Sequence, residues 1–132
     1  MYQTSFFIPF YSADPSDILF YGQVFSITHQ AYEQMIKDRV CSWPEWFQNP
    51  DWVVPMKHTE ATYLLPIQPG QECLIKVNLA EIRTSSFTLE FELSQQERLC
   101  CRVKAVHVFC TKANFQKQAI PSQIKASLQA LI

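Results

Sequence analysis

The chain has 132 residues, of which 48% are hydrophobic, 14% aromatic and 17% charged, and its formal net charge is −1. We expect residues 1–132 to form a single domain, since one hydrophobic core serves roughly 100–150 residues. The lack of net positive charge argues against a nucleic-acid-binding protein, which would carry a basic patch. Because Gly22 and Gly70 are the only two glycines, the chain lacks the glycine-rich loops that bind nucleotide phosphates.

The N-terminal segment and the cysteines point to an intracellular protein. Residues 1–10 contain no basic stretch followed by a long apolar run, so we expect no signal peptide. No stretch reaches the roughly 18 apolar residues of a membrane span. The five cysteines follow no metal-like spacing and fit small core residues in a reducing compartment. We therefore predict a cytoplasmic protein without a bound metal, and in a strand the adjacent Cys100 and Cys101 would lie on opposite faces.

The first part of the chain reads as a strand, a turn and a long helix. Alternating apolar residues predict a strand over residues 3–10, and Asp14 to Asp17 has the composition of a turn. From residue 23 to about residue 40, apolar residues recur at the spacing of an amphipathic helix, at Val24, Ile27, Ala31 and Met35.

Residues 41–57 hold all three tryptophans and three of the eight prolines. Proline at this density interrupts regular structure, so we predict an irregular connection with one helical turn over residues 44–47. The tryptophan rings suit the wall of a pocket for an aromatic or long apolar group. The same rings would also serve to cap the core or a subunit interface.

The second half of the chain reads as strands followed by a short helix. Alternation predicts strands over residues 58–65, 73–79, 87–94 and 99–110, with a polar turn at residues 95–98. A short helix opens at Ile120-Pro121. Because the helices are segregated from the strands, we predict an α+β fold whose antiparallel sheet packs on the long helix.

Two segments resemble a known enzyme family. Residues 14–22, Asp-Pro-Ser-Asp-Ile-Leu-Phe-Tyr-Gly, resemble the acidic loop before the central helix in the 4-hydroxybenzoyl-CoA thioesterase family. The run Pro55-Met56-Lys57-His58, with Pro66 and Gly70 downstream, resembles the 1,4-dihydroxy-2-naphthoyl-CoA thioesterase branch. The resemblance extends from about Phe6 to Pro121. It implies the hotdog fold, in which a curved antiparallel sheet wraps around a long central helix.

The resemblance also implies a function and a site. It implies an acyl-CoA thioesterase that hydrolyses an aromatic acyl-CoA to the free acid and coenzyme A. No cofactor is implied, because coenzyme A is part of the substrate. It further implies a homodimer or homotetramer with the active site at the subunit interface.

The family pattern assigns roles to individual residues. Asp14 becomes the catalytic carboxylate, as nucleophile or as base, and the backbone N–H of Tyr21 becomes the oxyanion contact, with Gly22 letting the substrate approach closely. The substrate-binding residues implied are His58, Ser85, Ser86 and Phe87. Four of these residues also have a plainer interpretation: Asp14 fits an ordinary turn, His58 a structural histidine, and Ser85 and Ser86 a polar strand start. We expect His107 to be structural.

Asp17 is a departure from the family, which carries a glycine at this position of the loop, and it adds a second carboxylate near Asp14. An aspartate adopts some glycine conformations only at a cost. The departure keeps a non-catalytic acyl-CoA-binding protein among the possible functions. Hydrolysis of a thioester on an acyl-carrier protein is the other alternative.

Overall fold

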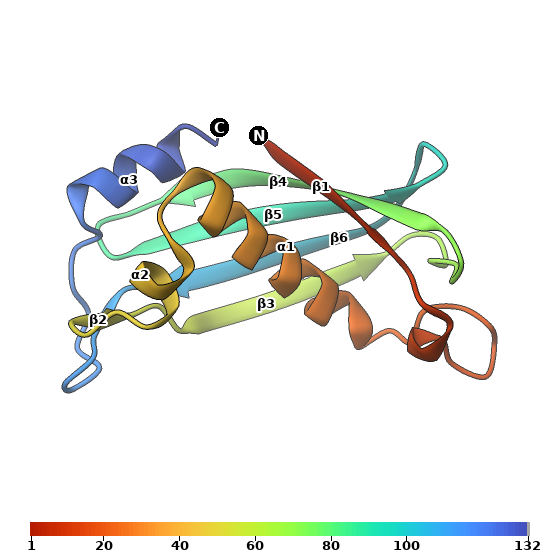
Figure 1. Ribbon diagram of the computed structural model, residues 1–132, viewed down its shortest axis with the longest axis horizontal. Helices are drawn as coiled ribbons and strands as arrows, with labels where there is room; N and C mark the ends of the chain where they lie inside the picture. The colour runs from red at the N-terminus through yellow and green to blue at the C-terminus, as the bar shows by residue number, and fades with distance from the viewer. Residues whose placement is uncertain (132) are drawn as a thin grey trace.

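One antiparallel sheet and one long helix dominate the structure, a computed structural model that describes residues 1–131 and leaves Ile132 of the predicted domain outside. The five strands of the sheet lie in the order β1-β4-β5-β6-β3 (Figure 1). Their bounds are Tyr2–Phe7 for β1, Met56–Tyr63 for β3, Glu72–Ile82 for β4, Ser86–Gln95 for β5 and Arg98–Val108 for β6. Helix α1, Gln23–Arg39, crosses one face of this sheet. The arrangement confirms the predicted α+β class.

Helix α1 forms where the apolar periodicity predicts it, and its buried stripe is Val24, Thr28, Ala31, Tyr32, Met35 and Ile36. The sheet presents alternate residues of each central strand to this stripe, such as Val77, Phe91 and Val103 in one cross-strand row. Near the end of α1, the Tyr2 hydroxyl donates a 2.7 Å hydrogen bond to the Asp38 carboxylate. Burial of these alternating rows against one helix face is what fixes α1 on the sheet.

The first strand ends three residues earlier than predicted, at Phe7. Pro9 has no N–H to give to a sheet ladder, and a 3-10 turn, η1, follows at Phe10–Ser12. The chain still touches the sheet at Ile8, whose N–H donates to the carbonyl of Gln71 at 2.9 Å. The early end of β1 directs the following loop toward the start of α1.

The tryptophan-rich segment contains the predicted helical turn and a strand that was not predicted. Helix α2, Trp43–Phe47, begins after Ser42, whose hydroxyl accepts the N–H of Glu45. Strand β2, Trp52–Val53, pairs with β7, Cys110–Thr111, in a separate two-stranded sheet. Trp46 is buried, which confirms a core-capping position for this tryptophan.

Cys100 and Cys101, which the sequence predicts on opposite faces of a strand, are both buried. The register of β6 against β5 shifts here, from Cys101 opposite Leu93 to Leu99 opposite Ser94. The extra residue is a β-bulge, which breaks the simple alternation of side chains along a strand. At the C-terminal end of the chain, helix α3 spans Ser122–Gln129 and buries Leu128, as the sequence predicts.

Candidate active site

The loop between η1 and α1 holds the Asp14 side chain in a tight turn. The N–H of Asp14 donates to the carbonyl of Ile18 at 2.8 Å, and the N–H of Asp17 donates to the carbonyl of Asp14 at 3.0 Å. The Asp14 carboxylate itself accepts the N–H of Ser16 at 2.7 Å. This local bond satisfies one oxygen of the carboxylate and leaves acceptor capacity on the group.

Asp17, at the glycine position of the family loop, has the conformation that a glycine would provide, with φ of 63°. Aspartate is one of the few side chains found repeatedly in this left-handed region, because its short polar group bonds locally. The turn is therefore preserved despite the substitution.

Unpaired backbone N–H groups lie at the start of α1. Phe20 donates its N–H to the carbonyl of Ser12 at 2.9 Å, and Gln23 donates to the carbonyl of Phe20 at 2.9 Å. Between them, the N–H groups of Tyr21 and Gly22 have no hydrogen-bond acceptor among residues 1–131. The first N–H groups of a helix carry its positive end, which attracts a developing negative charge.

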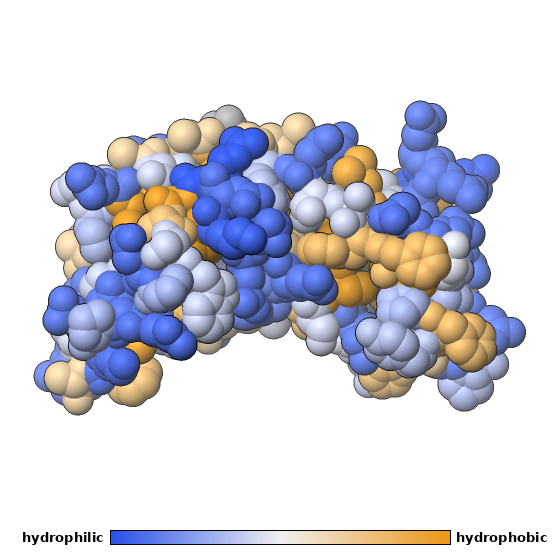
Figure 2. Space-filling view, viewed as in Figure 1, coloured by the Kyte–Doolittle hydropathy of each residue, from blue (hydrophilic) through white to orange (hydrophobic). Residues whose placement is uncertain are grey.

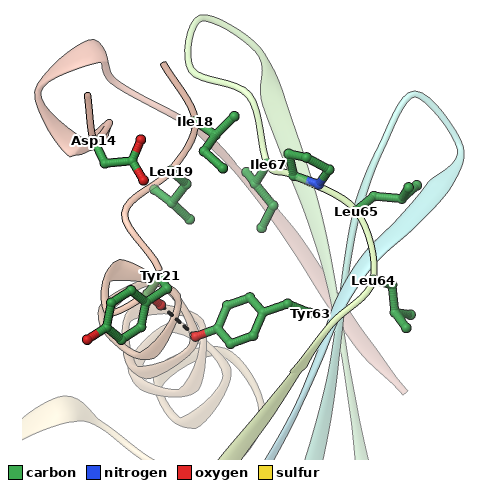
Figure 3. Close-up of a pocket in the computed structure, with 9 residues that line it drawn as sticks. Asp14, Ile18, Leu19, Tyr21, Tyr63, Leu64, Leu65 and Ile67 are labelled. Carbon is green, nitrogen blue, oxygen red and sulfur yellow. Dashed lines mark hydrogen bonds between the residues drawn. The ribbon is translucent and has the colours of Figure 1, made fainter. Parts of the chain in front are cut away.

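Asp14 and Tyr21 border the same cavity, of about 350 Å³. Figure 3 shows Asp14 and Tyr21 on the loop side of this cavity and Leu64 and Leu65 on the opposite side. The remaining lining residues are mainly apolar: Ile18, Leu19, Tyr63, Pro66 and Ile67. A carboxylate thus faces an otherwise apolar space beside a helix start.

The wall formed by residues 63–67 was missed by sequence reasoning. The Tyr63 hydroxyl donates to the carbonyl of Tyr21 at 2.6 Å, and Leu19 donates its N–H to the carbonyl of Ile67 at 2.8 Å. No local signal points to these contacts, because the two segments are more than 40 residues apart in the chain. Pairing between the loop and the end of β3 closes the cavity.

Large apolar side chains are exposed around this site. Tyr21 is 66% exposed and Phe10 is 76% exposed, and Phe20 and Tyr11 beside them are exposed as well. Figure 2 shows apolar surface gathered at the end of the molecule where η1 and the start of α1 lie. Exposed aromatic rings gathered in this way are typical of surfaces that meet a partner or a ligand.

The other predicted site residues lie at the opposite end of the sheet from Asp14 within one chain. Ser86 pairs with Val108, and Ser85 precedes it in the turn between β4 and β5. His58 pairs with Val106, on the face of the sheet away from α1, where its ring lies 3.3 Å from Glu60. Phe87 is 1% exposed, stacked against His107. The structure thus brings Asp14, Tyr21 and Gly22 together but not these four.

Metal-binding side chains do not converge in residues 1–131, where no group of three His, Cys, Asp or Glu is placed to hold an ion. The His29–Glu33 pair on α1 is a 3.1 Å contact, and Glu33 also accepts the Trp43 indole N–H at 2.9 Å. No helix in the described part of the chain is long and apolar enough to cross a membrane.

A family model described as the thioesterase-like superfamily matches residues 19–128. The chain belongs to this superfamily. Membership confirms the family that residues 14–22 predict, and the superfamily model begins within the candidate active-site loop and ends in α3.

Two curated relatives are similar to this chain over most of its length. The chain is 24% identical to the 1,4-dihydroxy-2-naphthoyl-CoA hydrolase of Nostoc punctiforme over 117 residues, covering 89% of this chain and 79% of that one. It is 23% identical to the enzyme of the same name from Synechococcus elongatus over 129 residues, covering 97% and 95% of the two chains.

The structural matches cover almost the whole chain. The 1,4-dihydroxy-2-naphthoyl-CoA thioesterase from Synechocystis has a TM-score of 0.89 at 19% identity, over 98% of this chain and 96% of that chain. A gentisyl-coenzyme A thioesterase has a TM-score of 0.86 at 18% identity, over 96% and 99%. The similarity between these thioesterase structures and the structure of this chain confirms the predicted hotdog fold.

Proposed function

We propose that the chain hydrolyses the thioester of an aromatic acyl-CoA. The observation that carries this proposal is that Asp14 and Tyr21 line one cavity, with unpaired N–H groups where α1 begins. The names of the relatives support an aromatic acyl group, since the naphthoyl and gentisyl thioesters in them are aromatic. Coenzyme A enters as part of the substrate and no separate cofactor takes part.

Hydrolysis needs a group that brings oxygen to the thioester carbonyl and a group that stabilises the oxyanion. The Asp14 carboxylate takes the first role, by attacking the carbonyl carbon or by removing a proton from the attacking water. The N–H groups of Tyr21 and Gly22 take the second role, because they are unpaired donors at the positive end of α1 and have no competing acceptor. The C–S bond then breaks, and the coenzyme A thiolate takes up a proton. If water has attacked, the free acid leaves at this step; if Asp14 has attacked, water next hydrolyses the acyl anhydride on Asp14, which releases the free acid and restores the carboxylate.

We further propose that two copies associate through β3. This strand ends the sheet, so one of its edges has no strand beside it, and seven of its eight residues are exposed. Two such edges related by a twofold axis pair antiparallel, which places the Met56 end of one copy against the Tyr63 end of the other. The dimer would bring His58, Ser85 and Ser86 of one copy toward the partner's Asp14 loop, and a homotetramer of two such dimers is the larger form.

The test compares thioester turnover in two matched variants of one loop. Coenzyme A release is measured by chromatography, which needs no thiol reagent and is therefore independent of the five free cysteines of the chain. The substrates are benzoyl-, 4-hydroxybenzoyl-, hydroxynaphthoyl-, octanoyl- and palmitoyl-CoA. We expect turnover of the aromatic thioesters, with kcat reduced at least about a hundredfold in Asp14→Asn and within about threefold of the original in Asp17→Asn, which removes the same charge.

Three results would overturn the proposal. The first is the absence of coenzyme A release from every thioester, and the second is equal activity of Asp14→Asn and the unchanged chain. The third is hydrolysis of the fatty thioesters alone. A single species with the mass of one chain in sedimentation equilibrium, at the concentration used for turnover, would overturn the dimer.

A further inference from the structure

A second cavity, of about 310 Å³, lies between the middle of α1 and the segment that leads into β3. It shares no lining residue with the cavity of Asp14. Tyr32, Trp46 and Phe47 provide aromatic walls, Met56 lies where β3 begins, and His107 contributes from β6. A cavity of this volume lies at the lower end of the roughly 300–1,000 Å³ that small-molecule pockets span.

His107 is the exceptional residue of this cavity. It is 2% exposed, and neither of its ring nitrogens has a hydrogen-bond partner among residues 1–131. Its faces are covered, since the Tyr32 ring stacks on it at 4.4 Å and the Phe87 ring at 5.1 Å between centroids. Burial lowers the pKa of His107 to about 3, so the ring is neutral and offers one donor and one acceptor.

Buried polar groups in folded proteins nearly always have partners, and an unpaired one points to a bound water, ion or ligand. The stacking that covers both faces of the His107 ring leaves only its edge for such a partner. The surrounding walls are aromatic, with Trp46 and Phe47 both in edge-on contact with Tyr32. A ligand that matches these features is a flat apolar ring that carries one hydrogen-bonding substituent.

We propose that this cavity holds the aromatic acyl group of the substrate and that His107 selects a ring bearing a polar substituent, such as a hydroxyl. This inference rests on the proposed thioesterase function and on pairing through β3. Because β3 runs from Met56 at this cavity to Tyr63 at the candidate active site, antiparallel pairing sets the cavity of one copy beside the catalytic loop of its partner. The acyl ring then lies in the cavity of one copy, and the thioester carbonyl lies at the catalytic loop of its partner.

The decisive variant is His107→Phe, which keeps the stacked ring and removes both nitrogens. We measure kcat/KM for benzoyl-CoA and 4-hydroxybenzoyl-CoA in the dimeric protein. The unchanged chain should prefer the hydroxylated thioester, and His107→Phe should lose about tenfold on that substrate while staying within about threefold on benzoyl-CoA. Val106→Thr, the neighbouring position on the outer face of β6, is the matched control and should leave the ratio unchanged.

A second measurement tests the contact between His107 and the substituted ring without relying on hydrolysis. The imidazole nitrogens of histidine-labelled protein are followed by NMR during titration with 1-hydroxy-2-naphthoate and with 2-naphthoate, and the His107→Phe variant assigns the signal. We expect the His107 signals to shift with the hydroxylated acid and not with the other. Equal responses to both acids, no response to either, or an unchanged substrate ratio in His107→Phe would overturn the role of His107. If the unchanged chain hydrolyses none of the thioesters but still shows the selective NMR shift, the result would overturn the thioesterase function and not the role of His107.

Discussion

The hydroxyl of Tyr63, the last residue of β3, donates a 2.6 Å hydrogen bond to the carbonyl oxygen of Tyr21 at the start of α1. That carbonyl belongs to the same peptide unit as the N–H of Gly22. A hydrogen bond to the carbonyl polarises the peptide and fixes its plane, so the Gly22 N–H becomes a better and better-aimed donor. Burial raises the pKa of Tyr63, which keeps the hydroxyl protonated and able to donate.

Tyr63→Phe should therefore lower kcat with little change in KM. We expect a decrease of about fivefold to tenfold, which corresponds to one hydrogen bond of about 1 kcal/mol that acts mainly in the transition state. Steady-state kinetics on the best aromatic acyl-CoA measures this. An unchanged kcat, or a rise in KM alone, would show that Tyr63 only shapes the cavity wall.

Asp17 has a φ of 63°, so its replacement separates the cost of the backbone conformation from the role of its charge. Asp17→Val should destabilise the chain by about 1–2 kcal/mol, because a branched side chain is disfavoured in the left-handed region. Asp17→Gly should be neutral or slightly stabilising, since glycine adopts this φ freely. Urea unfolding measures both, and equal midpoints for the two variants would contradict the prediction.

The two glycines make a similar pair. Gly70 has a φ of 80° with empty space around it, whereas Gly22 has a φ of −68° and a methyl group there would lie 3.0 Å from the exposed Phe20 ring. Gly70→Ala should cost about 1–2 kcal/mol from backbone strain. Gly22→Ala should cost less than about 1 kcal/mol, because the Phe20 ring is free to turn into solvent. Thermal unfolding of both variants checks the order, and a larger loss at Gly22 would contradict it.

His107 makes the stability depend on pH. The unfolded chain binds a proton on this histidine below its ordinary pKa of about 6.5, while the folded chain does not until about pH 3. The contribution of the neutral His107 to the free energy of unfolding is therefore complete above about pH 6.5. It is lost as the pH falls from 6.5 toward 3, by up to about 1.4 kcal/mol per pH unit.

The free energy of unfolding at pH 7, 6 and 5 tests this dependence against His107→Phe. The carboxylates are common to both proteins, so their effect cancels in the difference. We expect the unchanged chain to lose about 1 kcal/mol more than the variant between pH 6 and pH 5. Parallel pH profiles would mean that His107 is accessible to protons in the folded state.

Local patterns in the sequence were enough for the helices, for the strands of the main sheet and for one side of the candidate site, but not for strand β2. The helix over residues 23–39 has an apolar stripe that repeats every turn, and Ser42 caps α2 through a bond to a residue three positions away. Asp14 and Tyr21 lie in one short segment, so a resemblance over nine residues placed them together. Each of these features depends on residues close in the chain, which is why the sequence by itself determined them.

Tertiary structure alone decided the other side of the site. Tyr63 meets Tyr21 across 42 residues, and the bulge that buries both Cys100 and Cys101 arises from the register of β6 on β5. His107 reads in the sequence as a structural histidine, and the structure places its ring between those of Tyr32 and Phe87. Its unpaired nitrogens emerge only once α1, β5 and β6 are packed together, because hydrogen-bond satisfaction depends on neighbours from all three elements.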